Sequence, residues 1–100
     1  MITSKQRAFL RSLAMPLKPN VIIGKGEVDE NIIREISLNL DANEIVKISI
    51  LQNSDYEAKE LINELAKNLF AEPVSCVGRK IVLYRRSTKK GVKHIELPTV

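Results

Sequence analysis

The 100-residue sequence has little of the chemistry that most catalytic and metal sites require. It contains one cysteine (Cys76), one histidine (His94), no tryptophan and four other aromatic residues. A lone cysteine forms no internal disulfide, and these residues make no cluster of metal ligands. No apolar run approaches the roughly 20 residues that span a bilayer, and the N-terminus lacks the apolar stretch of a secretory signal. We therefore expect a cytoplasmic protein that contacts no membrane and binds neither a metal nor a cofactor.

The residues that could act in catalysis are also poorly arranged for it. Glu57, Glu60 and Glu64 have helical spacing, but they fall on the polar side of their helix. Cys76 lies between valines in an expected strand, where its expected role is that of a small buried apolar residue. No nucleophile, base and orienting group occur together. The sequence predicts neither an enzyme nor a small-molecule substrate.

Charge is distributed unevenly along the chain, which carries 16 Lys and Arg against 12 Asp and Glu. Residues 1–25 carry a net charge of +5, residues 26–76 a net charge of −7, and residues 77–100 a net charge of +6. If the fold brings its two ends together, the protein has a basic face that suits a polyanion and an acidic back. The alternative is that the basic ends are merely solvated.

Three segments have apolar residues at helical spacing. The first opens with a capping box of Thr3 and Gln6, and Pro16 ends it. The second follows Asp29, a favoured N-cap residue, and the third follows a capping box that begins at Ser54. The expected apolar faces are Phe9, Leu10, Leu13, Ala14 and Leu17; Ile32, Ile33, Ile36 and Leu40; and Ala58, Leu61, Ile62, Leu65, Ala66 and Leu69.

Strands are expected at residues 21–23, 45–50, 73–77 and 80–85. The first is a buried β-branched run, the second alternates apolar and polar residues, and the last is apolar on both alternating sets, as in a central strand. The order αβαβαββ predicts an α/β sandwich with some parallel pairing. Residues 1–86 then form one domain, and residues 87–100 form a basic, mobile tail.

Two local features suggest contact with an anion. Gly24, Lys25 and Gly26 follow a strand and precede a helix, so backbone N–H groups and a mobile cation are available there. The spacing matches no standard nucleotide-binding loop, and a plain turn is the alternative. In residues 78–86, basic side chains bracket an apolar strand, and Tyr84 either stacks on a base or belongs to the core.

Together these motifs resemble a known family. Residues 2–7 (ITSKQR), 17–19 (LKP), 22–26 (IIGKG) and 78–85 (GRKIVLYR) are similar to the bacterial YhbY proteins. Those are single-domain members of the CRM (chloroplast RNA splicing and ribosome maturation) family. The resemblance covers residues 2–86. It implies three helices on a four-stranded mixed sheet, as in the C-terminal domain of translation initiation factor three. It also implies RNA binding and association with ribosomal RNA in precursors of the large ribosomal subunit.

The family's G-x-x-G loop maps onto positions 24–27, where this sequence departs from the pattern with Glu27. A carboxylate there repels phosphate, or it caps the next helix. Charge and resemblance together indicate one RNA-binding face. Its candidate residues are Lys5, Arg7, Arg11, Lys18, Gly24, Lys25, Gly26, Arg79, Lys80, Arg85 and Arg86.

Other interpretations remain open at this point. The chain could be an interaction module that docks on a ribosomal protein, or a general nucleic-acid-binding protein like the Alba family. An Alba-like function predicts a dimer that also binds duplex DNA, whereas we expect a monomer. The acid-free first 26 residues also have the composition of an organellar transit peptide, but the first helix and strand need the same residues.

Overall fold

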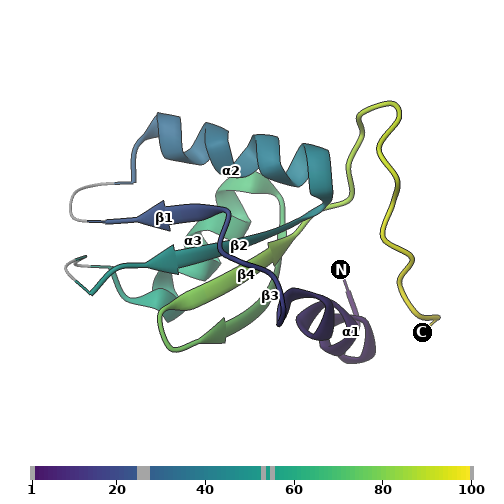
Figure 1. Ribbon diagram of the computed structural model, residues 1–100, viewed down its shortest axis with the longest axis horizontal. Helices are drawn as coiled ribbons and strands as arrows, with labels where there is room; N and C mark the ends of the chain where they lie inside the picture. Colours follow the sequence, from purple (N-terminus) through teal and green to yellow (C-terminus); the bar gives the residue numbers. More distant parts are fainter. Residues whose placement is uncertain (1, 25–27, 53, 55, 100) are drawn as a thin grey trace.

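The computed structural model describes residues 2–24, 28–52, 54 and 56–99, and its elements follow the expected order (Figure 1). The helices are α1 (Ser4–Ala14), α2 (Glu30–Asn43) and α3 (Ala58–Leu69), and the strands are β1 (Val21–Ile23), β2 (Ile45–Ile50), β3 (Glu72–Val77) and β4 (Lys80–Tyr84). These strands form a sheet in the order β1-β2-β4-β3. β1 is parallel to β2, and the other neighbours are antiparallel. The expected mixed four-stranded sheet with three helices is confirmed.

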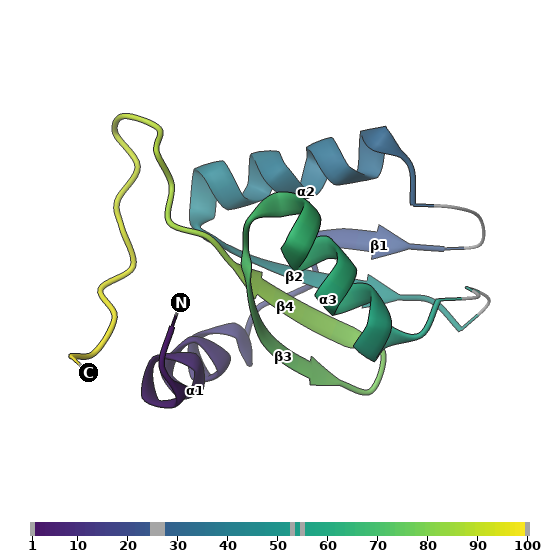
Figure 2. The ribbon, with the colours of Figure 1, turned by 180° about the vertical axis from the view of Figure 1, so that it is seen from behind.

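Helices α2 and α3 cover one face of the sheet (Figure 2). Their apolar sides meet alternate residues of the strands, because successive side chains of a strand point to opposite faces. The resulting core contains Val21, Ile23, Ile36, Leu40, Val46, Ile48, Ile50, Leu61, Ile62, Leu65, Ala66, Leu69, Ile81 and Leu83. Strand β4 is buried on both faces from Ile81 to Tyr84, as a central strand should be, and its first residue, Lys80, is exposed.

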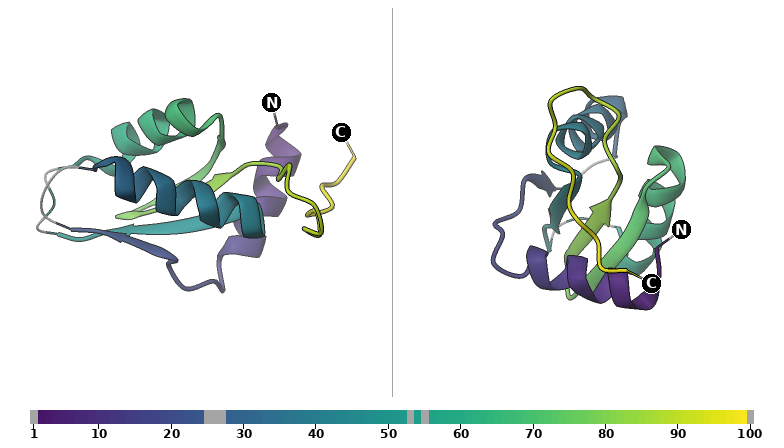
Figure 3. Two further views of the ribbon diagram at one scale, coloured as in Figure 1. Left: turned by 90° about the horizontal axis from the view of Figure 1, so that it is seen from above. Right: turned by 90° about the vertical axis from the view of Figure 1, so that its right-hand side faces the viewer.

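Helix α1 packs on the opposite face (Figure 3, right). The predicted capping box is present, since the Thr3 hydroxyl accepts from the Gln6 N–H and the Gln6 side chain accepts from the Thr3 N–H. The apolar stripe is only partly buried: Leu10 and Ala14 enter the core, whereas Phe9 and Leu13 are 37% and 39% exposed. The reason is that α1 is a single helix lying over one end of the sheet, so only one narrow side of it meets strands.

Lys47 anchors the end of α1. Its ammonium group donates to the carbonyl oxygens of Ala14 (3.1 Å), Met15 (3.4 Å) and Leu17 (3.0 Å). Carbonyls at the end of a helix have no partner within the helix and carry partial negative charge, so a cation there is favourable. The sequence pattern had indicated only that Lys47 faces away from the main core. The structure shows that it holds α1 on the sheet.

The start of α3 differs from the prediction. Its N-cap is Glu57, which makes no side-chain cap hydrogen bond, and the Ser54 hydroxyl instead accepts from the Tyr56 N–H. The capping box at Ser54 was therefore wrong. Ser54 belongs to a turn: its N–H donates to the Leu51 carbonyl, and its own carbonyl accepts from Arg79. Those contacts hold Ser54 outside the helix.

Strand β1 is less buried than expected. Val21 and Ile23 are in the core, but Ile22 is 61% exposed. In the described sheet β1 pairs only with β2, and α1 does not extend over it. An edge strand covered on one face buries only alternate residues.

The segment after Arg86 is attached to the domain through Glu44. This residue ends α2 with a left-handed backbone (φ 67°), and its side chain is fully buried. Its carboxylate accepts from the backbone N–H groups of Ser87 and Ile95 and from the ring of His94, each at 2.6 Å. Gln6 also donates to the Pro98 carbonyl (3.1 Å), so the two ends of the chain lie side by side (Figure 1). Mobility of residues 87–100 stays a prediction.

Glu44→Gln tests the contribution of this carboxylate to stability. The new amide nitrogen cannot accept from the backbone N–H that it faces, so the free energy of unfolding should fall by about 1–3 kcal/mol. Urea denaturation of the variant, with exposed Glu35→Gln on α2 as its control, measures the difference. Equal stabilities of the two variants would contradict this role.

The Glu44 contribution should also depend on pH. Burial raises the pKa of Glu44, but hydrogen bonds from His94, Ser87 and Ile95 outweigh burial and leave the pKa below its ordinary value of 4.5. A lowered folded-state pKa stabilises the protein fully above the unfolded value, and the gain is lost as pH falls through the folded value. The stability gap between the native protein and Glu44→Gln should therefore be widest above pH 4.5 and narrow in acid.

Lys47→Met tests the anchoring of α1. The substitution keeps a long apolar side chain but removes the donor to three carbonyls, so the free energy of unfolding should fall by about 1–2 kcal/mol. Lys59→Met, at an exposed position of α3, is the matched control for urea denaturation. The same small effect in both variants would refute the anchoring role.

Candidate nucleic-acid interface

Half of the sheet face beneath α1 is open. Leu10 and Ala14 pack against Ile45, Val74, Val82 and Tyr84, which lie toward one end of that face. Toward the other end, the strand register places Ile22, Ser49, Lys80 and Val77 in one row across all four strands. Ile22 and Val77, the outer members of the row, are 61% and 71% exposed. The row therefore forms an open strip that combines apolar and basic side chains.

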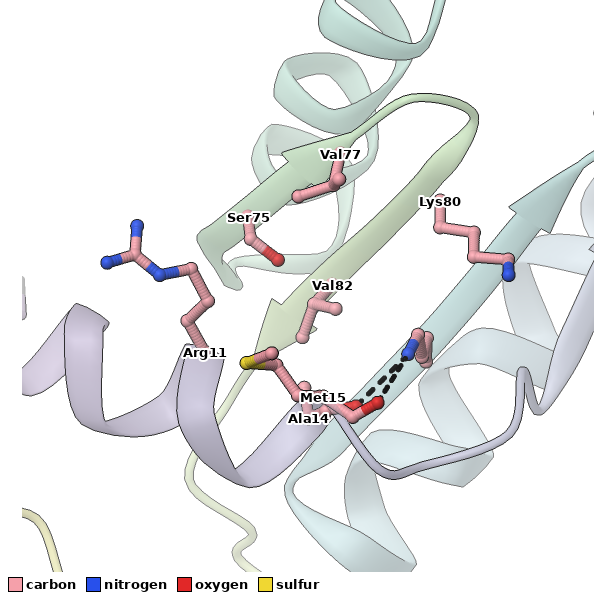
Figure 4. A pocket seen from close by; sticks show the side chains of 8 residues that line it. Arg11, Ala14, Met15, Ser75, Val77, Lys80 and Val82 are labelled. Atoms are coloured by element: carbon pink, nitrogen blue, oxygen red, sulfur yellow. Dashed lines mark hydrogen bonds between the residues drawn. The ribbon is translucent and has the colours of Figure 1, made fainter.

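A groove of about 370 Å³ lies between the end of α1 and this open face. Its lining residues come from α1 and its C-cap and from three strands, and they are Arg11, Ala14, Met15, Lys47, Ser75, Val77, Lys80 and Val82. Figure 4 shows Ser75, Val77 and Val82 side by side on the strands, with Arg11 beyond them on one side and Lys80 on the other. The surface of the groove is mainly apolar, and its charged groups are cations.

The two cations beside the groove are available to a ligand. Within the described residues, neither the Arg11 nor the Lys80 side chain forms a hydrogen bond or an ion pair. Lys47 is different, because its ammonium is directed at the α1 carbonyls. No carboxylate is among the lining residues. Arg11 and Lys80 thus offer two unneutralised positive charges next to an apolar surface.

The acidic residues of the middle of the chain are mostly on the other side. Described carboxylates on α2 and α3, the helices that cover the opposite sheet face, are Glu30, Glu35, Asp41, Glu60 and Glu64. Glu44 is buried and paired with His94. This arrangement separates an acidic helical side from the open side that carries Arg11 and Lys80.

Only part of the predicted basic set meets at the groove. Arg11 and Lys80 do, whereas Lys5 and Lys18 are exposed near α1 and Arg86 is exposed after β4, outside the groove lining. Arg7 donates to the Pro73 carbonyl at 3.0 Å, which ties α1 to β3.

Arg79 and Arg85 bind the protein's own backbone. Arg79 donates to the carbonyls of Ile50, Leu51 and Ser54, and so organises the turn before α3. Arg85 donates to the Leu69 and Ser37 carbonyls and pairs with Asp41 at 3.1 Å, on the side of α2 and α3. Both guanidinium groups are used in holding elements together, so neither faces the groove.

Only Gly24 of the predicted glycine turn belongs to the part of the chain that the structure describes. Lys25, Gly26 and Glu27 lie outside the described residues. Gly24 directly follows β1, and a Cβ added to it would meet Leu51 Cδ1 at 3.6 Å, an ordinary contact distance. Figure 1 shows the end of β1 and helix α1 at opposite ends of the sheet. The strand register nevertheless places Ile22, two residues before Gly24, in one row with Lys80 and Val77, so Lys80 lies toward the Gly24 end of the sheet while α1 lies toward the other end.

Tyr84 belongs to the core. Its side chain is 6% exposed among the residues that contact α1. Burial raises the pKa of the Tyr84 hydroxyl, the Glu44 carboxylate raises it further, and Arg86 opposes both. Of the two roles that the sequence left open, base stacking is excluded for this buried ring.

Sequence reasoning missed the apolar part of the groove and the role of Lys47. Met15 and Val77 are 75% and 71% exposed, so they leave apolar surface uncovered beside the two groove cations. The alternation of residues 45–50 placed Lys47 on this face. The same alternation in residues 73–77 would have placed Val77 and Ser75 on one face of their strand. Nothing local in the sequence shows that α1 stops short of these residues.

Two features are absent from the part of the chain that the structure describes. No group of three or more His, Cys, Asp or Glu side chains there is placed to hold a metal ion. None of the helices in the described ranges has the length and apolar character that crossing a bilayer requires.

Comparison with known proteins connects this geometry to a family. The chain is 41% identical over 98 residues to the "Probable RNA-binding protein YqeI" of Bacillus subtilis, covering 98% of this chain and all of the relative. It is 32% identical over 93 residues to an "RNA-binding protein" of Haemophilus influenzae, covering 92% and 93% of the two chains.

A solved structure agrees with the fold. The solution structure of Staphylococcus aureus SAV1595, described as a candidate RNA-binding protein, is similar with a TM-score of 0.80 and 42% sequence identity, over 98% of this chain and all of the other. The model of the CRS1/YhbY (CRM) domain matches residues 2–85. From sequence and fold together, the chain belongs to the CRS1/YhbY (CRM) domain family.

Proposed function

We propose that this protein binds RNA through α1 and the open face of its sheet, and that it catalyses no reaction. The observation that carries the proposal is the groove flanked by Arg11 and Lys80, with no carboxylate in its lining. Cations that are not neutralised by the protein bind phosphates and release counterions, which supplies most of the affinity in such complexes. The relatives named as RNA-binding proteins support the same ligand.

We further propose that the RNA is ribosomal and that binding takes place in the cytoplasm, on precursors of the large ribosomal subunit. The support is the resemblance of residues 2–86 to the YhbY proteins and the small size of the domain. A folded ribosomal RNA presents both phosphate backbone and unpaired nucleotides, and proteins recognise it largely by shape.

Reversing the two groove cations tests the RNA proposal. Arg11→Glu with Lys80→Glu should weaken binding to single-stranded RNA about tenfold or more, because two phosphate contacts become repulsive. The slope of log K against log salt should become shallower by about 1.4, the value for two phosphates on a single strand. Fluorescence anisotropy with a labelled oligonucleotide over a series of salt concentrations measures both quantities.

The matched control is Arg34→Glu with Lys59→Glu, which makes the same change in net charge at exposed positions of α2 and α3. This control should lose more than half of the native affinity for RNA only at low salt, because long-range charge matters most there. At higher salt it should keep more than half of the native affinity. Equal loss in the two double variants at about 0.15 M salt, where screening is strong, would show that net charge acts and that the groove does not.

The ribosomal proposal is tested in cells. Tagged protein should sediment in sucrose gradients with particles that contain precursor large-subunit RNA, and crosslinking followed by RNA sequencing should recover that RNA. The Arg11→Glu, Lys80→Glu variant should move to the top of the gradient. Recovery mainly of messenger or transfer RNA would contradict this target, and sedimentation that survives nuclease treatment would favour docking on a ribosomal protein.

A further inference from the structure

We infer that the groove between α1 and strands β3 and β4 is a binding site for one unpaired RNA nucleotide, with the base on the apolar side chains and the flanking phosphates on Arg11 and Lys80. This inference rests on the proposed RNA-binding function and specifies the form of RNA that is bound. It concerns residues of the sheet face and not the glycine loop that the family resemblance indicates.

The chemistry of the groove favours a base over a bare phosphate. Its exposed apolar side chains are Met15 and Val77, which offer no partner to a phosphate but can cover the face of a planar base, and the buried Val82 lies beneath them. Ser75 pairs with Val82 across the two strands, so its hydroxyl lies beside this apolar area and can accept or donate a hydrogen bond at a base edge. A site for phosphate alone would consist of N–H groups and cations.

The positions of the charges favour a nucleotide over an uncharged ligand. Arg11 and Lys80 lie on opposite sides of the apolar side chains (Figure 4). A nucleotide within a chain has a phosphate on each side of its sugar, so this arrangement is complementary to one nucleotide and its two neighbouring phosphates. The volume of about 370 Å³ falls at the lower end of the range for small-ligand sites.

The fold keeps the groove open. Helix α1 ends before Pro16, and Lys47 on β2 binds the carbonyls of Ala14 and Met15, which fixes the end of the helix beside the groove. The strands beneath are held by antiparallel pairing between β3 and β4. A site that exists before binding costs little ordering entropy. A base that is paired in a duplex cannot lie flat on this surface, so the groove selects unpaired RNA.

The test compares two probes and two variants. The probes are a labelled single-stranded RNA of about ten nucleotides, within the site sizes of single-strand-binding domains, and a fully paired RNA duplex. Val77→Ser removes exposed apolar surface from the groove without changing charge. Leu38→Ser is the matched control, since Leu38 is 59% exposed on α2.

Val77→Ser should weaken binding of the single strand about threefold to tenfold, the factor expected from the lost apolar contact, and leave the duplex affinity unchanged. Leu38→Ser should change neither affinity. If the native protein binds neither probe, the proposed RNA-binding function fails. If it binds RNA but Val77→Ser equals the native protein on both probes, the nucleotide site is refuted while RNA binding stands.

Two further measurements complete the test. The first measures binding of a labelled polyglutamate peptide to the native protein and to Val77→Ser. If the substitution weakens peptide binding as much as it weakens binding of the single strand, the groove is a peptide site and the inference is overturned. The second is photocrosslinking of the native protein to a 4-thiouridine oligonucleotide, which does not depend on the folding of any variant. Adducts at Met15 or residues 75–82 support the inference, and adducts found only elsewhere overturn it.

Discussion

The arrangement of this protein depends on how α1 is held on the sheet. An eleven-residue helix covers only part of one face, and its position is set by the Lys47 ammonium at its last carbonyls and by Arg7 at the Pro73 carbonyl. Both contacts give side-chain donors to backbone carbonyl oxygens, and those at the end of α1 have no partner within the helix. Because α1 is fixed at one end of the face, the other end stays open, and Lys80 and Val77 remain accessible.

Cations in this chain have two separate roles, which charge counting cannot distinguish. Arg79 and Arg85 directly precede and follow β4, which carries Lys80. Their guanidinium groups nevertheless bind backbone carbonyls of the turn before α3 and of the helix layer. Arginine suits this task because its planar group donates to several acceptors at once. Arg11 and Lys80 form no such contact within the described residues, and they are the groove cations to which we assign the RNA phosphates.

Glu44 has a left-handed backbone conformation that is unfavourable for a residue with a side chain, and the contacts of its carboxylate stabilise it. Glycine is favoured where a helix ends in the left-handed region, but only a carboxylate can accept from Ser87, His94 and Ile95 together. Through it the segment after β4 returns past α2 to α1, where Ile95 and Leu97 pack against the buried residues beneath α1, which include Leu10 and Tyr84. This joins the two basic ends of the chain, as their charge suggested.

The elements and their order were predictable without the fold, because helical and strand periodicity and the Thr3 and Asp29 caps are local properties. The sequence also indicated the family, since several short motifs occur in the right order. Tertiary structure alone decided that Ser54 lies in a turn, that Ile22 is on an edge, and which cations are free. Those outcomes depend on contacts between residues far apart in the chain, such as Lys47 with Leu17 and Arg79 with Leu51, and no periodicity encodes them.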